Sequence, residues 1–250
     1  MKTTFLILFF GFSILSYSQN PHYESWKNLA KDNISLQPEY GNAIKTEQQI
    51  KSDNDFIEDI LQYYNSKEEA SAEMLKLGMN YLYEKGDFVT AMKRFNQAYL
   101  LNQNNPGVYY GYGSIFFNLG AFEEAKIYYE KGLKIKPNHS EILTDYATVF
   151  LAAYYEDADT ENLKKAKNYL EQSLKADSKN SDTMYKLSIV SMNLGDCKNA
   201  RNYLKSAKKQ NNPNITKAFE AELSQKCDWK MRTVLVHAKN NYVILDGIKI

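Results

Sequence analysis

The chain has 250 residues, of which 44% are hydrophobic and 24% charged, and these ordinary globular values argue against wholesale disorder. Its 31 Lys and Arg nearly balance its 30 Asp and Glu, and only three of these basic residues are Arg. The overall composition therefore lacks the excess of positive charge that is typical of proteins that bind nucleic acid or anionic membranes. The three His and two Cys lie far apart in the sequence, which leaves little material for a metal site.

The first 18 residues have the pattern of a secretory signal peptide. Lys2 supplies the positive start, an apolar run extends from Phe5 to Leu15, and small residues at Ser16 and Ser18 suit a signal peptidase. The apolar run is about half of the ~20 residues that a membrane-spanning helix needs. We therefore expect cleavage of residues 1–18, an exported product that is periplasmic or secreted, and no stable membrane insertion after cleavage.

Residues 19–65 form a predicted N-terminal extension. A short helix is expected around residues 23–31. A second helix, marked by the apolar stripe of Ile57, Ile60, Leu61 and Tyr64, is expected to cap the repeats that follow.

An internal repeat dominates the middle of the chain. Ala91, Ala125, Ala166 and Ala200 are separated by 34, 41 and 34 residues. Further positions repeat with the same intervals: Phe95, Tyr129, Leu170 and Leu204, and also Gly113, Ala147 and Ser188. A period of 34 with one insertion of seven indicates four copies of one supersecondary unit.

These positions resemble the consensus of the tetratricopeptide repeat family. The second copy carries it most clearly, in Tyr109, Tyr112, Gly113, Phe116, Gly120, Ala125, Tyr129, Gly132 and Pro137. The predicted repeat region spans residues 66–213, with copies at 71–105, 106–139, 140–180 and 181–213. The resemblance implies an all-α fold, in which antiparallel helix pairs stack into a solenoid with a concave groove and capping helices.

The residues after the repeats change in character. Asn214 can start a capping helix over residues 214–228. Two β-branched runs, 233–236 and 242–245, are separated by Asn240 and Asn241, and we therefore predict a short β-hairpin within residues 229–250. Whether this tail pairs internally or with another chain stays open.

The two cysteines are expected to pair. Cys197 begins the second helix of the fourth repeat, and an antiparallel capping helix returns Cys227 to the same level after a matching length of chain. Export would permit oxidation. The alternative is that both residues remain as buried free thiols, because two cysteines form a disulfide only when their backbone positions meet strict geometric limits.

The resemblance also places the binding surface. In this family the first helix of each pair lines the groove and binds a protein or peptide partner. The corresponding stripe is poor in charge and rich in aromatic and Met side chains, which suits apolar or aromatic anchors of a peptide. Its residues are Met79, Tyr83, Tyr110, Ser114, Phe117, Asn118, Thr144, Thr148, Leu151, Tyr185, Ile189, Met192 and Asn193.

No constellation in the sequence indicates catalysis, a cofactor or a metal. An acidic cluster lies in the insertion of the third repeat and consists of Glu156, Asp157, Asp159 and Glu161. The Gly that a calcium-binding loop needs is absent, so we favour a solvated acidic loop over a calcium site. We expect a non-enzymatic, exported scaffold that serves cell-envelope assembly. The alternatives are a secreted factor that acts outside the cell and an enzyme with its site in the insertion or the tail; the partner and the oligomeric state stay open.

Overall fold

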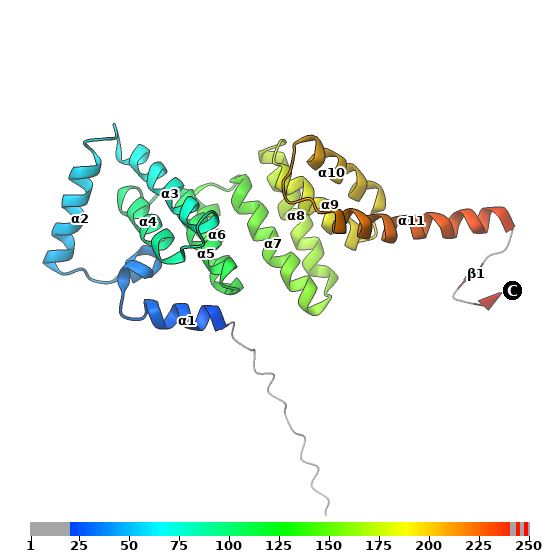
Figure 1. Ribbon diagram of the computed structural model, residues 1–250, viewed down its shortest axis with the longest axis horizontal. Helices are drawn as coiled ribbons and strands as arrows, with labels where there is room; N and C mark the ends of the chain where they lie inside the picture. The colour runs from blue at the N-terminus through cyan, green and yellow to red at the C-terminus, as the bar shows by residue number, and fades with distance from the viewer. Residues whose placement is uncertain (1–20, 241–243, 246–247, 250) are drawn as a thin grey trace, which may run out of the picture.

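The computed structural model describes residues 21–240, 244–245 and 248–249, with side chains as far as Asp228, so the predicted signal peptide lies outside the described residues. Eight of the described helices form four hairpin pairs that stack side by side (Figure 1). The pairs are α3 (Lys67–Tyr83) with α4 (Phe88–Leu101), α5 (Pro106–Asn118) with α6 (Phe122–Ile135), α7 (Ser140–Asp157) with α8 (Thr160–Ala176), and α9 (Ser181–Asn193) with α10 (Cys197–Lys209).

Local sequence explains how each hairpin closes. Gly120 lies in the turn between α5 and α6 with a φ of +72°, a conformation that costs glycine little. Within the same pair, a Cβ on Gly113 would lie 2.4 Å from Cε1 of Tyr129, so the ring of Tyr129 packs directly on the backbone of α5. The small residue of the repeat therefore lets the two helices of the pair approach closely.

The insertion in the third repeat is helical. Helices α7 and α8 have 18 and 17 residues, whereas α5 and α6 have 13 and 14. A single left-handed residue, Ala158 with φ +57°, ends α7, and the Asp159 side chain then caps α8 by accepting from the Glu161 N–H. The expectation of an acidic loop is therefore wrong, because the extra residues lengthen both helices and leave only a short turn.

The hydrophobic core runs along the stack rather than filling one centre. One cluster extends from Trp26 of α1 to Val149 of α7, a second joins α7, α8 and α9 around Leu163 and Leu187, and a third joins α9, α10 and α11 around Leu204 and Phe219. Each pair therefore buries its apolar stripe against its neighbours, as a solenoid requires.

The N-terminal extension consists of α1 (Pro21–Ala30), the 3₁₀ helices η1 (Ile34–Leu36) and η2 (Pro38–Asn42), and α2 (Glu47–Ile60). Trp26, Ala30 and Leu36 are buried in the first core cluster. Helix α2 stands at the N-terminal end of the stack, with Phe56, Ile57 and Ile60 partly buried against that cluster (Figure 1).

The C-terminal prediction needs correction. Helix α11 covers Lys217–Asn240, so residues 233–236 are helical and the predicted β-hairpin between residues 233–236 and 242–245 is wrong. No Gly or Pro interrupts the chain from Lys217 to Asn240, and a helix already started at Thr216 therefore continues through the β-branched run. The strands β1 (Ile244–Leu245) and β2 (Ile248–Lys249) are each two residues long and pair with each other in the antiparallel sense.

None of the helices in the described part of the chain is long and apolar enough to cross a membrane.

Candidate binding groove

A groove of about 470 Å³ runs across the first helices of all four pairs. Helix α3 contributes one residue to its lining, α5 three, α7 three and α9 four, and the turn before α11 adds one. The lining residues are Tyr83, Tyr110, Phe117, Asn118, Asp145, Thr148, Leu151, Asp182, Tyr185, Lys186, Ile189 and Asn214. Eight of the thirteen residues expected in the groove lie in this lining.

Three charged residues occupy the C-terminal part of the groove. The Lys186 Nζ lies 3.1 Å from Asp145 Oδ1 and 2.7 Å from Asp182 Oδ2, and its side chain is only 16% exposed. Burial lowers the pKa of Lys186, but the two carboxylates outweigh it, so the net pKa is raised and the ammonium stays charged. Two carboxylates around one ammonium leave one negative charge in the groove.

Tyrosine side chains surround this charged cluster. Burial, and secondly the charge of Asp145, raises the pKa of Tyr83 and of Tyr110, so both phenols stay neutral and can donate hydrogen bonds. The Tyr110 ring lies 6.4 Å from Tyr129 and 6.3 Å from His139, measured between ring centroids. The Tyr83 side chain is 53% exposed and is thus the most accessible aromatic anchor of the groove.

The other five expected residues lie away from the lining. Ser114 and Thr144 are buried beneath it, and Met79 is half-buried against the first core cluster. Met192 and Asn193 line a separate cavity of about 570 Å³ beside α11. These five side chains share helix faces with the groove but turn toward the core or toward α11.

The predicted stripe leaves out four residues of the lining, Asp145, Asp182, Lys186 and Asn214. The spacing of Asp182 and Lys186 by four residues on one helix was a usable signal, since such residues share a helix face. Asp145 comes from a different repeat, and only the stacking of α7 against α9 brings it within reach of Lys186.

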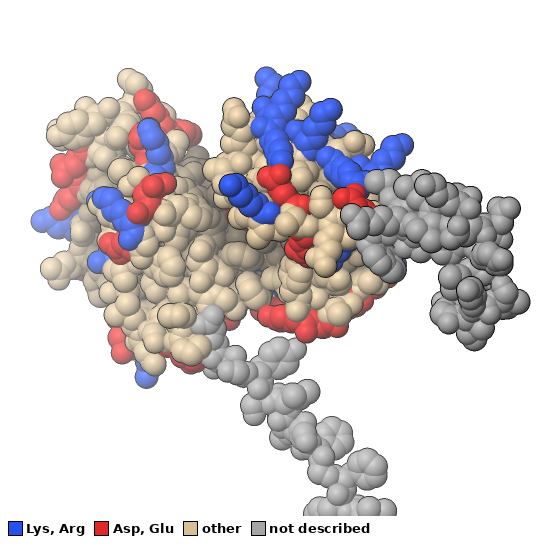
Figure 2. Space-filling view, turned by 45° about the vertical axis from the view of Figure 1, so that its right-hand side comes forward, with Lys and Arg blue, Asp and Glu red and all other residues tan. Residues whose placement is uncertain are grey.

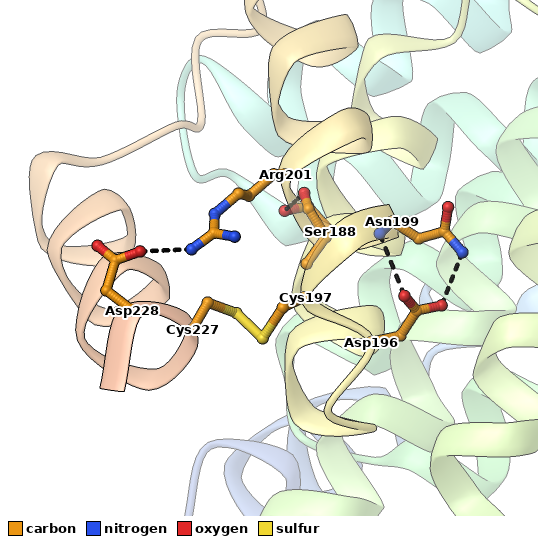
Figure 3. The surroundings of a disulfide bond; sticks show 8 residues. Ser188, Asp196, Cys197, Asn199, Arg201, Cys227 and Asp228 are labelled. Atoms are coloured by element: carbon orange, nitrogen blue, oxygen red, sulfur yellow. Dashed lines mark hydrogen bonds and ion pairs between the residues drawn. A yellow bond between two sulfur atoms is a disulfide. The ribbon is translucent and has the colours of Figure 1, made fainter. Parts of the chain in front are cut away.

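The structure joins Cys197 at the start of α10 to Cys227 in α11, with 5.5 Å between the Cα atoms (Figure 3). Beside this bond, Arg201 Nη2 donates to Asp228 Oδ1 at 2.5 Å, a second link between the same helices. Cys227 is 1% exposed, and Cys197 contributes to the cavity of about 570 Å³.

The acidic residues of the insertion act locally. Asp157 Oδ1 accepts from the Asp159 N–H at 2.7 Å, and Asp159 caps α8. Among the described residues, no group of three His, Cys, Asp or Glu side chains is placed to hold a metal ion.

Stacked helix hairpins, with core clusters that follow one another along the stack and a groove along their first helices, define a helical repeat solenoid. Residues 106–139, which include α5 and α6, match the model of the tetratricopeptide repeat family. Residues 106–139 are thus similar to a tetratricopeptide repeat, and the pairs α3–α4, α7–α8 and α9–α10 are helix hairpins of the same kind. Tetratricopeptide repeat proteins typically act as non-enzymatic scaffolds for protein–protein interaction.

Comparison with solved structures gives a similar chain described as the "MamA RS-1 ArsTM double mutant". The two share 18% sequence identity with a TM-score of 0.43, over 65% of this chain and 95% of the other. No curated protein sequence matches the chain significantly.

Proposed function

We propose that the protein is an exported scaffold that holds a protein or peptide partner in the groove and serves assembly of the cell envelope. The observation that carries the proposal is that first helices from all four pairs contribute to one continuous groove lined by Tyr83, Tyr110, Phe117 and Tyr185. A surface of this shape, with aromatic anchors spread along it, suits a helical or extended peptide. Export rests on the signal-peptide pattern of residues 1–18.

The charges in the groove narrow the chemistry of the partner. Asp145 and Asp182 exceed Lys186 by one negative charge, and Lys186 already has two carboxylate partners. An acidic group or a free C-terminal carboxylate therefore finds no unpaired cation there. A segment with apolar anchors and one Lys or Arg complements both the tyrosines and the excess carboxylate.

Tyr83→Ala tests the groove, because Tyr83 is half-exposed and its loss leaves the core intact. A displayed library of random dodecapeptides is selected on the chain without residues 1–18, and the enriched peptides are titrated by calorimetry. We expect Tyr83→Ala to weaken binding by about 1–2 kcal/mol, the scale of an aromatic hot spot.

Tyr63→Ala is the matched control, since Tyr63 is 80% exposed, lies after α2 and does not line the groove. We expect this variant to bind as the wild type does. Wild-type affinity in Tyr83→Ala, for peptides that bind the unaltered protein, would show that the groove is not the binding site. Enriched peptides rich in Asp and Glu would contradict the inferred charge preference alone.

A further inference from the structure

Helix α10 concentrates positive charge in a chain that is nearly neutral overall. Its 13 residues include five basic and no acidic side chains: Lys198, Arg201, Lys205, Lys208 and Lys209. The near-neutral total for the whole chain therefore conceals a strongly basic element.

The basic residues of α10 face outward because its apolar residues face the core. Ala200, Leu204 and Ala207 recur at spacings of four and three residues and are buried. Arg201 and Lys208 are paired with Asp228 and Glu220 of α11. The remaining three basic side chains are exposed and have no ion pair among the described residues; they are Lys198, Lys205 and Lys209.

These three lysines form part of a larger basic surface. They span about 16 Å along α10, at 1.5 Å per residue. Figure 2 shows Lys and Arg side chains gathered along the upper edge of the C-terminal repeats, with Asp and Glu gathered along the lower edge. Basic side chains thus predominate along the upper edge, although some of them, such as Arg201 and Lys208, are paired with carboxylates.

The composition of this surface favours one kind of partner. Protein interfaces are depleted in Lys, and their hot spots are enriched in Trp, Tyr and Arg. The exposed residues of α10 are instead Lys, Asn, Ser and one partly exposed Arg, which does not favour a protein partner. Recognition of nucleic acid relies on Arg forks or on aromatic stacking, and the only aromatic side chain of α10 is the partly buried Tyr203. Unpaired lysine ammonium groups on flexible side chains suit the negatively charged headgroup layer of an anionic membrane.

We propose that the outer face of α10 adsorbs to an anionic lipid bilayer, through Lys198, Lys205 and Lys209. Adsorption through this helix leaves the groove free, because the groove is lined by α3, α5, α7, α9 and Asn214 and includes no residue of α10. Binding through these exposed lysines is peripheral, because their ammonium groups stay among the lipid headgroups. This proposal is independent of what the groove binds.

Cosedimentation with lipid vesicles tests the proposal. The chain without residues 1–18 is used, because the apolar leader would itself enter lipid and every side-chain contact described above lies within residues 21–228. Vesicles of phosphatidylcholine alone are compared with vesicles that also contain phosphatidylglycerol, at low and high salt. We expect binding only to the anionic vesicles, and release at high salt.

The variant K198Q/K205Q/K209Q is expected to partition about 100-fold less, since each near-surface lysine contributes about a factor of five. The matched control is K51Q/K93Q/K134Q, which removes three exposed lysines from α2, α4 and α6 and keeps the α10 face; it is expected to bind as the wild type does. Circular dichroism checks that both variants keep their helices.

Equal loss in the two variants would mean that net charge alone drives adsorption, and would overturn the assignment to α10. Failure of the wild type to bind anionic vesicles, or equal binding to neutral vesicles, would overturn the proposal altogether. Tighter binding to poly-glutamate or to a single-stranded oligonucleotide than to the vesicles would identify a different class of partner and also contradict it.

Discussion

Four buried hydroxyl groups meet where α7, α8 and α9 come together. Thr144 Oγ1 lies 2.8 Å from Ser173 Oγ and 2.6 Å from Thr183 Oγ1, and Ser140 Oγ lies 2.8 Å from Ser173 Oγ. Asn180 Nδ2 completes the network by donating to Ser140 Oγ at 2.8 Å. The third and fourth helix pairs are therefore joined by a satisfied polar network as well as by apolar packing.

We expect Thr144→Val to lower the free energy of unfolding by about 1–3 kcal/mol, because it leaves buried hydroxyls of Ser173 and Thr183 with one partner fewer. The shape of the side chain is almost unchanged, so packing contributes little. Thr148→Val, one turn further along α7, is the matched control. Its hydroxyl is half-buried and bonds only to the Thr144 carbonyl, and we expect a loss below about 1 kcal/mol. Urea unfolding measures both variants, and equal losses would mean that the network adds nothing to stability.

At the scale of elements, α11 depends on few attachments. Phe219, Leu223 and Cys227 are its buried residues among those with described side chains, and they recur every four residues along one face. The disulfide to Cys197 and the Arg201–Asp228 ion pair hold the same stretch against α10. The helix is therefore anchored over its first three turns.

Reduction of the disulfide is expected to destabilise the protein by about 3–4 kcal/mol in the chain-entropy model, because the bond closes a loop with a sequence separation of 30. Hydrogen exchange in α11 should rise most. The difference in unfolding free energy between the oxidised and the reduced wild type gives the contribution of the disulfide alone, since both forms have the same sequence. Detection of two titratable thiols in the unreduced, denatured protein would contradict the pairing of Cys197 with Cys227.

At the scale of the molecule, the N-terminal extension ties the first two helix pairs together from outside the groove. Asn96 of α4 is fully buried; its Nδ2 donates to the carbonyls of Ser35 and Gln37, and its Oδ1 accepts from the Tyr112 hydroxyl of α5 at 2.6 Å. Farther along the extension, Glu39 forms an ion pair with Lys131 of α6. One segment thus contacts three helices from two pairs.

The same segment has an unusual backbone. Glu39, Tyr40 and Asn42 have φ values of +58°, +56° and +52°, and each left-handed non-glycine residue costs on the order of 1 kcal/mol. The Glu39 N–H donates to the Tyr112 hydroxyl at 3.2 Å, and the ammonium of Lys45 lies 3.5 Å from the centre of the Tyr40 ring. Tertiary contacts therefore hold a turn that its own sequence disfavours.

We expect Asn96→Ala to lower the free energy of unfolding by about 2–3 kcal/mol, because two partly buried carbonyls lose a hydrogen-bond donor and the Tyr112 hydroxyl loses its nearest acceptor. Hydrogen exchange should accelerate in residues 33–42 and stay unchanged in α9 and α10. Asn80→Ala, at an exposed position of α3, serves as the control and should change neither quantity. Protection of residues 33–42 equal to that of the wild type would show that Asn96 does not hold the extension.

The helix pairs were predictable from the sequence because their determinants are local or periodic. The recurrence of Ala91, Ala125, Ala166 and Ala200 identifies positions where helices touch, and all four are buried. Helix starts such as Asp87 and Asp159 follow from side chains that cap the next backbone N–H groups. Gly120 marks its turn because a left-handed φ suits glycine.

Interactions between segments far apart in the sequence decided the structure of both flanks and the charged residues of the groove. The run 233–236 reads as a strand by composition, yet it continues a helix already started at Thr216. Asp145 and Lys186 meet in the groove only because α7 stacks on α9, and residues 33–42 take their backbone from contacts with Asn96, Tyr112 and Lys131. The sequence by itself determined the repeating helix pairs, because caps, turns and periodic burial act within one repeat. The charged residues of the groove and the paths of the two flanking segments depend instead on which distant segments pack together, and only the tertiary structure decides that packing.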